Sequence, residues 1–329
     1  MDTALIIGGT RFIGRHTVAE LLDHGYEVTL FNRGRHENPF GNDDRVRQVT
    51  GDRTDRDALE AAATDVDPDV TIDCVAYDPR EVETATEVFA DCEAYVYVSS
   101  GAVYADDEIP KREGETPLRE CSAEQARDDS GASYGPRKAE GDRAVFAAAD
   151  RGVRAMSVRP SVVYGPHDYT ERLDYWIDRV NRYERIAVPG DGGSLYHLSA
   201  VGDVARALRV VAERGTAGDA YNVADRQVAT IDERLSLIAE SVGTTVEPVY
   251  ASERELENED LSPGDFVLYR SRPHLLATNA LASLGWEEMS LEAATERAVV
   301  DHRESDRAGR EHGPDRENEE RLIEALDTD

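Results

Sequence analysis

The sequence predicts an α/β protein with a doubly wound parallel sheet and a smaller C-terminal α/β lobe. In the first half of the chain, short apolar runs without alternation recur between helical patterns, as expected for strands buried on both faces of a parallel sheet. Glycines occupy the first strand-to-helix turn, at Gly8, Gly9 and Gly14. With 329 residues, of which 40% are hydrophobic, the chain can bury one large domain and a smaller lobe.

The chain is strongly acidic, with a net charge of −31 spread over every segment, and Lys111 and Lys138 are the only lysines among its 37 basic residues. This composition resembles that of proteins from high-salt cytoplasms, and it shows no basic stripe for nucleic acid. The apolar runs are too short to span a bilayer, the N-terminal residues predict no secretory signal, and the three cysteines lack metal-ligand spacing. We expect a cytoplasmic protein with no metal and no membrane or nucleic-acid partner.

Residues 4–31 predict a βαβ unit around the glycine turn. An apolar strand at residues 4–7 is followed by a helical pattern from about residue 15 to residue 24 and by a second strand at residues 27–31. Glycines let the backbone approach a pyrophosphate closely, and a helix N-terminus adds N–H donors and a positive dipole. An ordinary strand-to-helix turn is the alternative, but the strand–helix–strand context favours nucleotide binding.

The next elements continue the alternation of strands and helices. The pattern predicts strands at residues 46–49, 69–77, 94–98, 151–159 and 220–224, with helices near residues 57–63, 82–90, 134–149, 173–183 and 231–242. Residues 105–130 are acidic and polar without an apolar period, which predicts a long loop over the site.

Tyr134 and Lys138 are four residues apart, so a helix would place both side chains on one face. Pro136 fits only the first turn of such a helix, where its missing N–H costs nothing. An ammonium beside a phenol favours the phenolate and lowers the pKa of the tyrosine, which suits an acid/base pair. The alternative is a solvated helix start with an incidental tyrosine.

Four motifs occur in a fixed order: the Gly8 to Gly14 turn, Ser99-Ser100 before Val103-Tyr104, the Tyr134/Lys138 pair, and Arg159-Pro160 before Tyr164-Gly165-Pro166. In this order the chain resembles the short-chain dehydrogenase/reductase superfamily, and specifically its extended branch of epimerase- and dehydratase-like proteins, over about residues 4–300. The middle glycine of the family pattern is replaced by Arg11. Gly-Gly-Thr-Arg-Phe-Ile-Gly is similar to an atypical subgroup that includes chloroplast nucleic-acid-associated proteins.

The resemblance implies an NAD(P)-dependent epimerase, dehydratase or reductase that acts by hydride transfer. Ser100 would position the substrate oxygen, with Ser99 as the runner-up, while Tyr134 exchanges the proton and Lys138 lowers its pKa. The substrate would be a sugar, a nucleotide-sugar or a small carbonyl or hydroxyl compound. The implied cofactor-binding residues are Gly8, Gly9, Thr10, Arg11, Phe12, Ile13, Gly14, Asn32, Arg33, Asp52, Arg53, Val75, Ala76, Tyr77, Ser99, Tyr134, Lys138, Pro160 and Val163.

The choice between NADP and NAD depends on the end of the second strand. NAD-preferring members usually place an acid there, whereas this chain has Asn32 and Arg33, which favours NADP. Arg11 could serve the same phosphate, and both arginines could equally be surface residues. Asp52 is expected to meet the adenine, with a turn or N-cap role as the alternative.

We expect residues 1–166 to bind the dinucleotide, with about residues 195–225 completing the sheet, and residues 167–194 and 226–300 to form the substrate lobe. Residues 301–329 predict a weakly held, charged tail with a terminal helix. The partners expected are a small-molecule substrate and a second copy of the chain in a homodimer. A non-redox dinucleotide-sensing or RNA-associated protein on the same fold is the alternative function. The candidate substrate residues are Tyr104, Tyr164, His167, His197 and Arg272.

Overall fold

The computed structural model describes residues 1–328, so residue 329 of the expected tail lies outside it. The chain folds as two compact units. Unit 1 comprises residues 1–163, 201–224 and 275–288, and unit 2 comprises the remaining described residues, 164–200, 225–274 and 289–328.

Unit 1 is built on a seven-stranded sheet in which every neighbouring pair of strands is parallel. The strand order is β11-β6-β5-β4-β1-β2-β3, so the chain starts in the middle and winds outward in both directions. This arrangement confirms the predicted doubly wound sheet. Its strands are β1 (Thr3–Ile7), β2 (Glu27–Asn32), β3 (Val46–Thr50), β4 (Val70–Asp73), β5 (Ala94–Val98), β6 (Ala155–Pro160) and β11 (Ala220–Val223).

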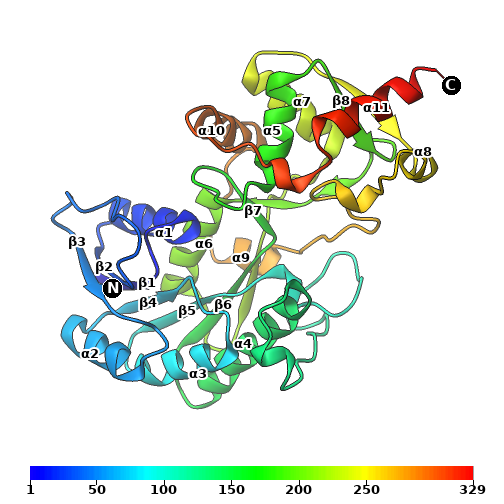
Figure 1. Ribbon diagram of the computed structural model, residues 1–329. Helices are drawn as coiled ribbons and strands as arrows, with labels where there is room; N and C mark the ends of the chain where they lie inside the picture. The colour runs from blue at the N-terminus through cyan, green and yellow to red at the C-terminus, as the bar shows by residue number, and fades with distance from the viewer. Residues whose placement is uncertain (329) are drawn as a thin grey trace. The chain divides into compact units, whose positions relative to one another are not determined.

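Helices cover both faces of this sheet (Figure 1). On one face, α1 and α6 pack on Ile6 and Leu30; on the other, α2, α3 and α4 pack on Leu5 and Ile7. Because consecutive strand residues point to opposite faces, both sides of β1 are apolar and all four of these residues are at most 1% exposed. The helices of unit 1 are α1 (Phe12–Asp23), α2 (Arg56–Val66), α3 (Pro79–Val88), α4 (Gly131–Asp150), α6 (Val201–Arg214) and α9 (Asn279–Ser283).

Two helix boundaries differ from the prediction. Helix α1 begins at Phe12, three residues earlier than expected, because the last residues of the glycine motif already form its first turn. Helix α4 begins at Gly131, so Pro136 lies inside the helix and not in its first turn. The expectation for Pro136 was therefore wrong. A proline removes one backbone hydrogen bond from a helix. The helix continues through Pro136 because the surrounding packing outweighs that loss.

Unit 2 is a smaller α/β assembly. Strands β8 and β13 pair in parallel, strands β9 and β12 pair in antiparallel fashion, and α7 packs against both α5 and α10. Its elements are α5 (Arg172–Arg182), β8 (Arg185–Pro189), β9 (Leu195–Tyr196), β10 (Leu198–Ala200), β12 (Ala229–Thr230), α7 (Ile231–Val242), β13 (Glu247–Ala251), α8 (Glu253–Asn258), α10 (Leu291–Arg303) and α11 (Arg316–Leu326), while β7 (Val162–Tyr164) runs from unit 1 into unit 2.

The C-terminal segment is firmly attached to unit 2, so the expectation of a weakly held tail was wrong. Glu319 of α11 is fully buried; its carboxylate pairs with Arg179 at 3.0 Å and accepts the Ala187 N–H at 2.9 Å. Upstream, the Glu171 carboxylate accepts the Gly309 N–H at 2.9 Å. These contacts join residues that are more than a hundred positions apart, which is why composition alone suggested a solvated tail.

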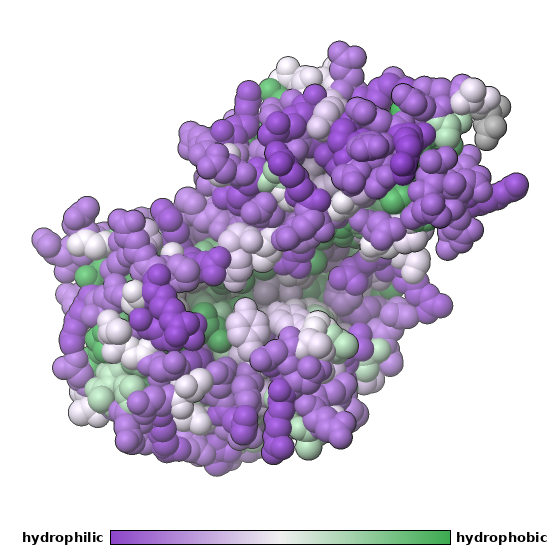
Figure 2. All heavy atoms as spheres, viewed as in Figure 1, coloured by the Kyte–Doolittle hydropathy of each residue, from purple (hydrophilic) through white to green (hydrophobic). Residues whose placement is uncertain are grey.

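Hydrophilic residues cover most of the face shown in Figure 2, over both units, in keeping with the spread of acidic residues along the chain. Among residues 1–328, no helix has both the length and the apolar character that a bilayer span requires.

Candidate active site

The glycine turn between β1 and α1 is shaped for close approach by a ligand. Gly8 and Gly9 have φ values of 114° and 92°, which residues with a Cβ rarely adopt. A Cβ on Gly14 would lie 2.7 Å from the backbone nitrogen of Gly9, so only glycine lets α1 pack this tightly on the turn. Arg11 occupies the N-cap position, and its side chain has no acceptor with which to cap the helix N–H groups. The turn therefore fits the pyrophosphate of a dinucleotide.

The end of β2 lies beside this turn. The Asn32 side chain donates to the Gly8 carbonyl at 3.2 Å and accepts from the Gly34 N–H at 2.9 Å, so it fixes the turn rather than pointing away from it. Arg33 is exposed, and both Arg33 and Arg35 help to lower the pKa of Asp52. The end of β2 is thus electropositive.

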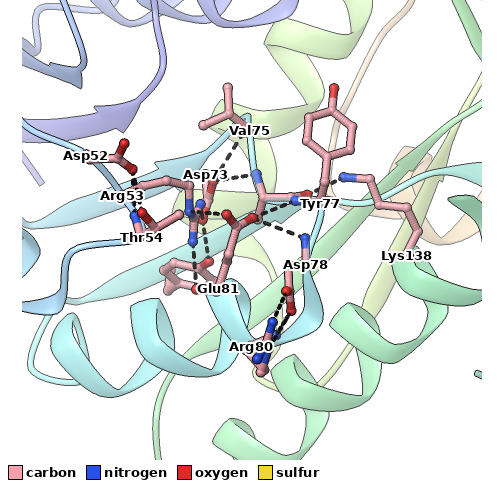
Figure 3. Close-up of polar contacts among 12 residues, drawn as sticks. Asp52, Arg53, Thr54, Asp73, Val75, Tyr77, Asp78, Arg80, Glu81 and Lys138 are labelled. Atoms are coloured by element: carbon pink, nitrogen blue, oxygen red, sulfur yellow. Dashed lines mark hydrogen bonds and ion pairs between the residues drawn. The ribbon is translucent and has the colours of Figure 1, made fainter. Parts of the chain in front are cut away.

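Asp52 and Arg53 follow β3 and face different surroundings. Hydrogen bonds from the Thr54 N–H and hydroxyl to the Asp52 carboxylate are the main cause of its lowered pKa. Arg53 turns inward, where its guanidinium pairs with Asp73 at 2.5 Å and donates to the Glu81 carbonyl at 2.6 Å (Figure 3). The structure therefore places the charge of Arg53 in a buried ion pair.

Residues 75–77 follow β4. Val75 and Tyr77 are 38% and 45% exposed, whereas Ala76 is buried. Val75 lies against Gly8, because a Cβ on that glycine would be 3.1 Å from a Val75 methyl group. The expected cofactor segments at the ends of β1 and β4 are therefore adjacent.

Lys138 lies in a closed cage beneath this segment. Its ammonium donates hydrogen bonds of 2.8 Å to the carbonyl oxygens of Ala76 and Val98, and it lies 4.8 Å and 4.7 Å from the ring centres of Tyr77 and Tyr97. The Tyr134 ring is 6.0 Å from the ammonium. Burial lowers the pKa of Lys138 from 10.5 to about 8, although Asp73 and other acids act in the opposite direction. The structure thus brings Tyr134 and Lys138 together.

The two serines after β5 have different environments. Ser100 caps a 3₁₀ turn at Gly101–Val103, with its hydroxyl accepting the Ala102 N–H at 3.2 Å. Ser99 is 2% exposed, and its hydroxyl has no hydrogen-bond partner among the described residues. Ser100 is the more accessible of the two.

A buried polar network joins β6, α4 and β11. Arg159 of β6 pairs with Asp142 at 2.8 Å and donates to the Tyr104 hydroxyl at 2.9 Å, and that hydroxyl donates to Asn222 of β11 at 2.7 Å. Tyr104 is 1% exposed, so the structure places this candidate substrate residue inside unit 1. The sequence analysis did not single out Asp142. Its position four residues after Lys138, on the same face of a helix, could have indicated it.

The remaining candidates lie at the end of β6, in β7 or in unit 2. Pro160 pairs with Val223, and Val163 belongs to the apolar core on the α1 and α6 face. Within unit 2, the Tyr164 hydroxyl and the His197 ring bond to Asp225, and burial lowers the pKa of His197. His167 faces Asp301, and Arg272 is exposed.

The sheet order, the glycine turn and the Tyr134/Lys138 pair define a nicotinamide-dinucleotide-binding protein of the Rossmann type. Residues 4–224 match the model of the NAD dependent epimerase/dehydratase family, and the chain belongs to that family. The family is described as one of NAD dependent epimerases and dehydratases.

Two curated relatives illustrate the range of this similarity. The chloroplast stem-loop binding protein of 41 kDa b from Arabidopsis thaliana is 29% identical over 251 residues, which cover 73% of this chain and 63% of that protein. This chain thus spans less than two thirds of that relative. The low-salt glycan biosynthesis protein Agl12 from Haloferax volcanii is 27% identical over 329 residues, which cover 91% of this chain and 97% of that protein.

Solved structures share the fold at lower identity. UDP-glucose 4-epimerase from Thermotoga maritima, solved with UDP-glucose, has a TM-score of 0.71 at 20% identity and covers 92% of this chain and 99% of its own. dTDP-glucose 4,6-dehydratase from Bacillus anthracis, solved with NAD, also has a TM-score of 0.71 at 20% identity, with 93% and 97% covered.

Proposed function

We propose that this protein is an NAD(P)-dependent epimerase, dehydratase or reductase of the extended short-chain dehydrogenase type, with Ser100, Tyr134 and Lys138 as its catalytic residues. The observation that carries the proposal is the Lys138 cage. A buried ammonium 6.0 Å from the Tyr134 ring supplies the positive charge that a tyrosine needs to act as an acid or base near neutral pH.

Each catalytic side chain has one role in this proposal. The Tyr134 hydroxyl exchanges a proton with the substrate oxygen, the Lys138 ammonium favours the phenolate, and the Ser100 hydroxyl holds the substrate oxygen. When bound, the nicotinamide dinucleotide supplies the acceptor or donor of hydride. The residues that would hold it are the turn from Gly8 to Gly14, Asp52, and residues 75–77.

NADP is the preferred form in this proposal. The end of β2 has Asn32 where an acid would repel a 2′-phosphate, and the exposed Arg33 follows it. The charges of Arg33 and Arg35 help to lower the pKa of Asp52, the residue assigned to the adenine end of the cofactor. Their charge is therefore near the part of the site where the 2′-phosphate would lie.

The substrate in this proposal is a sugar, a nucleotide-sugar or a small carbonyl or hydroxyl compound.

The test is turnover of NADP(H) and NAD(H) by the parent and by Tyr134→Phe, across sugars, nucleotide-sugars and small carbonyl compounds. We expect the variant to lose about a hundredfold in turnover, the usual worth of a positioned acid or base. Tyr250→Phe, an exposed tyrosine of unit 2, is the matched control. Equal turnover by Tyr134→Phe and the parent contradicts the catalytic assignment. Tight dinucleotide binding with no turnover on the whole panel would favour the dinucleotide-sensing or RNA-associated alternative, which the chloroplast relative suggests.

A further inference from the structure

The four backbone N–H groups of residues 75–78 are held by two carboxylates. One oxygen of Asp73 accepts the N–H groups of Val75 and Ala76, at 3.2 Å and 3.1 Å. One oxygen of Glu81 accepts those of Tyr77 and Asp78, at 2.9 Å and 3.1 Å. The conformation of this short segment is therefore set by side chains and not by a sheet or helix ladder.

Arg53 joins the two carboxylates. Its guanidinium pairs with the second oxygen of Asp73 at 2.5 Å, and its Nε lies 3.6 Å from the other oxygen of Glu81. Tyr95 donates to the same Asp73 oxygen at 3.0 Å. The Arg53 side chain is 9% exposed, Asp73 is fully buried and Glu81 is partly buried, so the three charged groups form one connected unit that is largely shielded from solvent. Figure 3 shows their contacts. Burial would lower the pKa of Arg53, but Asp73 above all raises it beyond its ordinary value.

The held segment carries two of the groups that enclose Lys138. The Ala76 carbonyl accepts the Lys138 ammonium at 2.8 Å, and the Tyr77 ring covers that ammonium at 4.8 Å. Ala76 therefore links the two systems directly, because its N–H bonds to Asp73 while its carbonyl bonds to Lys138. A change in the carboxylates would move the acceptor of the lysine.

We propose that Arg53, Asp73 and Glu81 are positioning residues for Lys138: they fix residues 75–78 so that the Ala76 carbonyl and the Tyr77 ring hold the ammonium beside Tyr134. None of the three bonds directly to Lys138 in the described residues; they act through the segment and through their charge. The catalytic consequence of this arrangement rests on the proposed function, but the positioning itself does not.

Four charged residues act on the pKa of Lys138, and the signs of their effects make the proposal measurable. Burial lowers the pKa of Lys138 to about 8; Asp73, Asp142 and Glu81 act to raise it, and Arg53 acts to lower it. Removing the Asp73 charge should therefore lower the pKa further. The other titratable groups near the ammonium are Tyr77, Tyr97, Tyr134 and Cys74.

The lysine content of the chain permits a direct measurement that needs no substrate. Lys111 and Lys138 are the only lysines, so lysine labelled with ¹³C at Cε gives two resonances, and the one absent from Lys138→Met belongs to Lys138. Titration of that resonance gives the pKa of Lys138 in each folded variant. Hydrogen exchange of a peptide covering residues 73–81 reports how firmly residues 75–78 are held.

Two variants test the two parts of the proposal. In Asp73→Asn we expect the pKa of Lys138 to fall by about one pH unit, because the charge that raises this pKa most is lost. In Glu81→Ala we expect exchange at residues 75–78 to rise about tenfold and the Lys138 resonance to shift. We expect Glu81→Gln to restore the slow exchange, since an amide oxygen can still accept the two N–H groups. Glu83→Ala, on an exposed position of the same helix, should change neither.

The outcome that overturns the proposal is a folded Asp73→Asn or Glu81→Ala protein in which the Lys138 resonance and its titration match the parent. Thermal unfolding establishes folding, and Asp73→Asn provides the test if Glu81→Ala does not fold. The kinetic counterpart is the pH profile of turnover, whose alkaline limb should move to lower pH in Asp73→Asn. If the lysine titration moves but no variant or parent turns over a substrate, the proposed function fails while the positioning role stands.

Discussion

The Lys138 ammonium donates a 2.8 Å hydrogen bond to the carbonyl oxygen of Ala76, a residue 62 positions earlier in the chain. Together with the equal bond to Val98, this contact fixes the ammonium at the ends of β4 and β5, two adjacent strands of the sheet. The carboxyl ends of strands are where ligands bind in open parallel sheets. The lysine is thus anchored by the sheet itself, and this geometry determines how pH and substitution should act on it.

Turnover should decline above pH 8. The pKa of Lys138 is lowered by burial to about 8, so at higher pH the ammonium becomes neutral and no longer favours the Tyr134 phenolate. We expect the alkaline limb of kcat/KM to have a midpoint near pH 8, and to be absent from Lys138→Met, whose residual activity has no lysine to titrate. A parent profile that stays flat to pH 10 would contradict this assignment of the limb.

Stability should show the opposite trend over a neighbouring range. The folded-state pKa of Lys138, about 8, is below its ordinary value of 10.5, so between these values the unfolded chain binds the additional proton. Stability then rises with pH across this range, because deprotonation removes the cost of burying the charge. Urea unfolding of the parent minus that of Lys138→Met should show a difference that increases from pH 8 to pH 10. A constant difference would mean that the folded lysine titrates normally.

The glycine turn, the parallel sheet and the Tyr134/Lys138 pair could be anticipated from sequence because each is a local pattern. The polar network around them could not, since its members come from distant parts of the chain. Arg53 meets Asp73 20 residues later, and Tyr104 meets Asn222 118 residues later. Such pairs have no characteristic spacing in the sequence from which they could be predicted. Composition was also misleading for the C-terminal segment, because the buried Glu319 is one acid among 68 acidic residues.

Arg33→Ala should weaken NADP binding more than NAD binding. The arginine is exposed and follows Asn32, so its removal takes away a cation that only the 2′-phosphate needs. We expect about a tenfold loss of NADP affinity and little change for NAD, measured by calorimetry. Arg56→Ala, an exposed arginine of α2, is the matched control. An unchanged ratio of the two affinities would rule out the 2′-phosphate role.

Gly14→Ala should disrupt the dinucleotide turn. The new methyl group would lie 2.7 Å from the Gly9 nitrogen and 2.9 Å from its Cα, so the helix and the turn would have to separate. We expect a loss of about 1–3 kcal/mol in the free energy of unfolding and a clear loss of NADP and NAD affinity. Gly131→Ala is the control, because a Cβ there meets nothing within 4 Å and alanine favours a helix. Equal effects of the two variants would mean that the close approach of α1 is unimportant.

Arg179→Ala should destabilise unit 2 by releasing the C-terminal segment. Its side chain pairs with the fully buried Glu319 at 3.0 Å and donates to the Pro314 carbonyl at 2.6 Å, so the substitution leaves a buried carboxylate with one cation fewer. Removing one partner of a buried pair typically costs about 3–5 kcal/mol, although Arg316 still contacts Glu319 and should reduce that cost. Arg185→Ala, which breaks the exposed pair with Asp327, should cost less than about 1 kcal/mol. Urea unfolding measures both values. If the two variants are equally stable, the segment is held by its apolar contacts, and Arg179 does not anchor it.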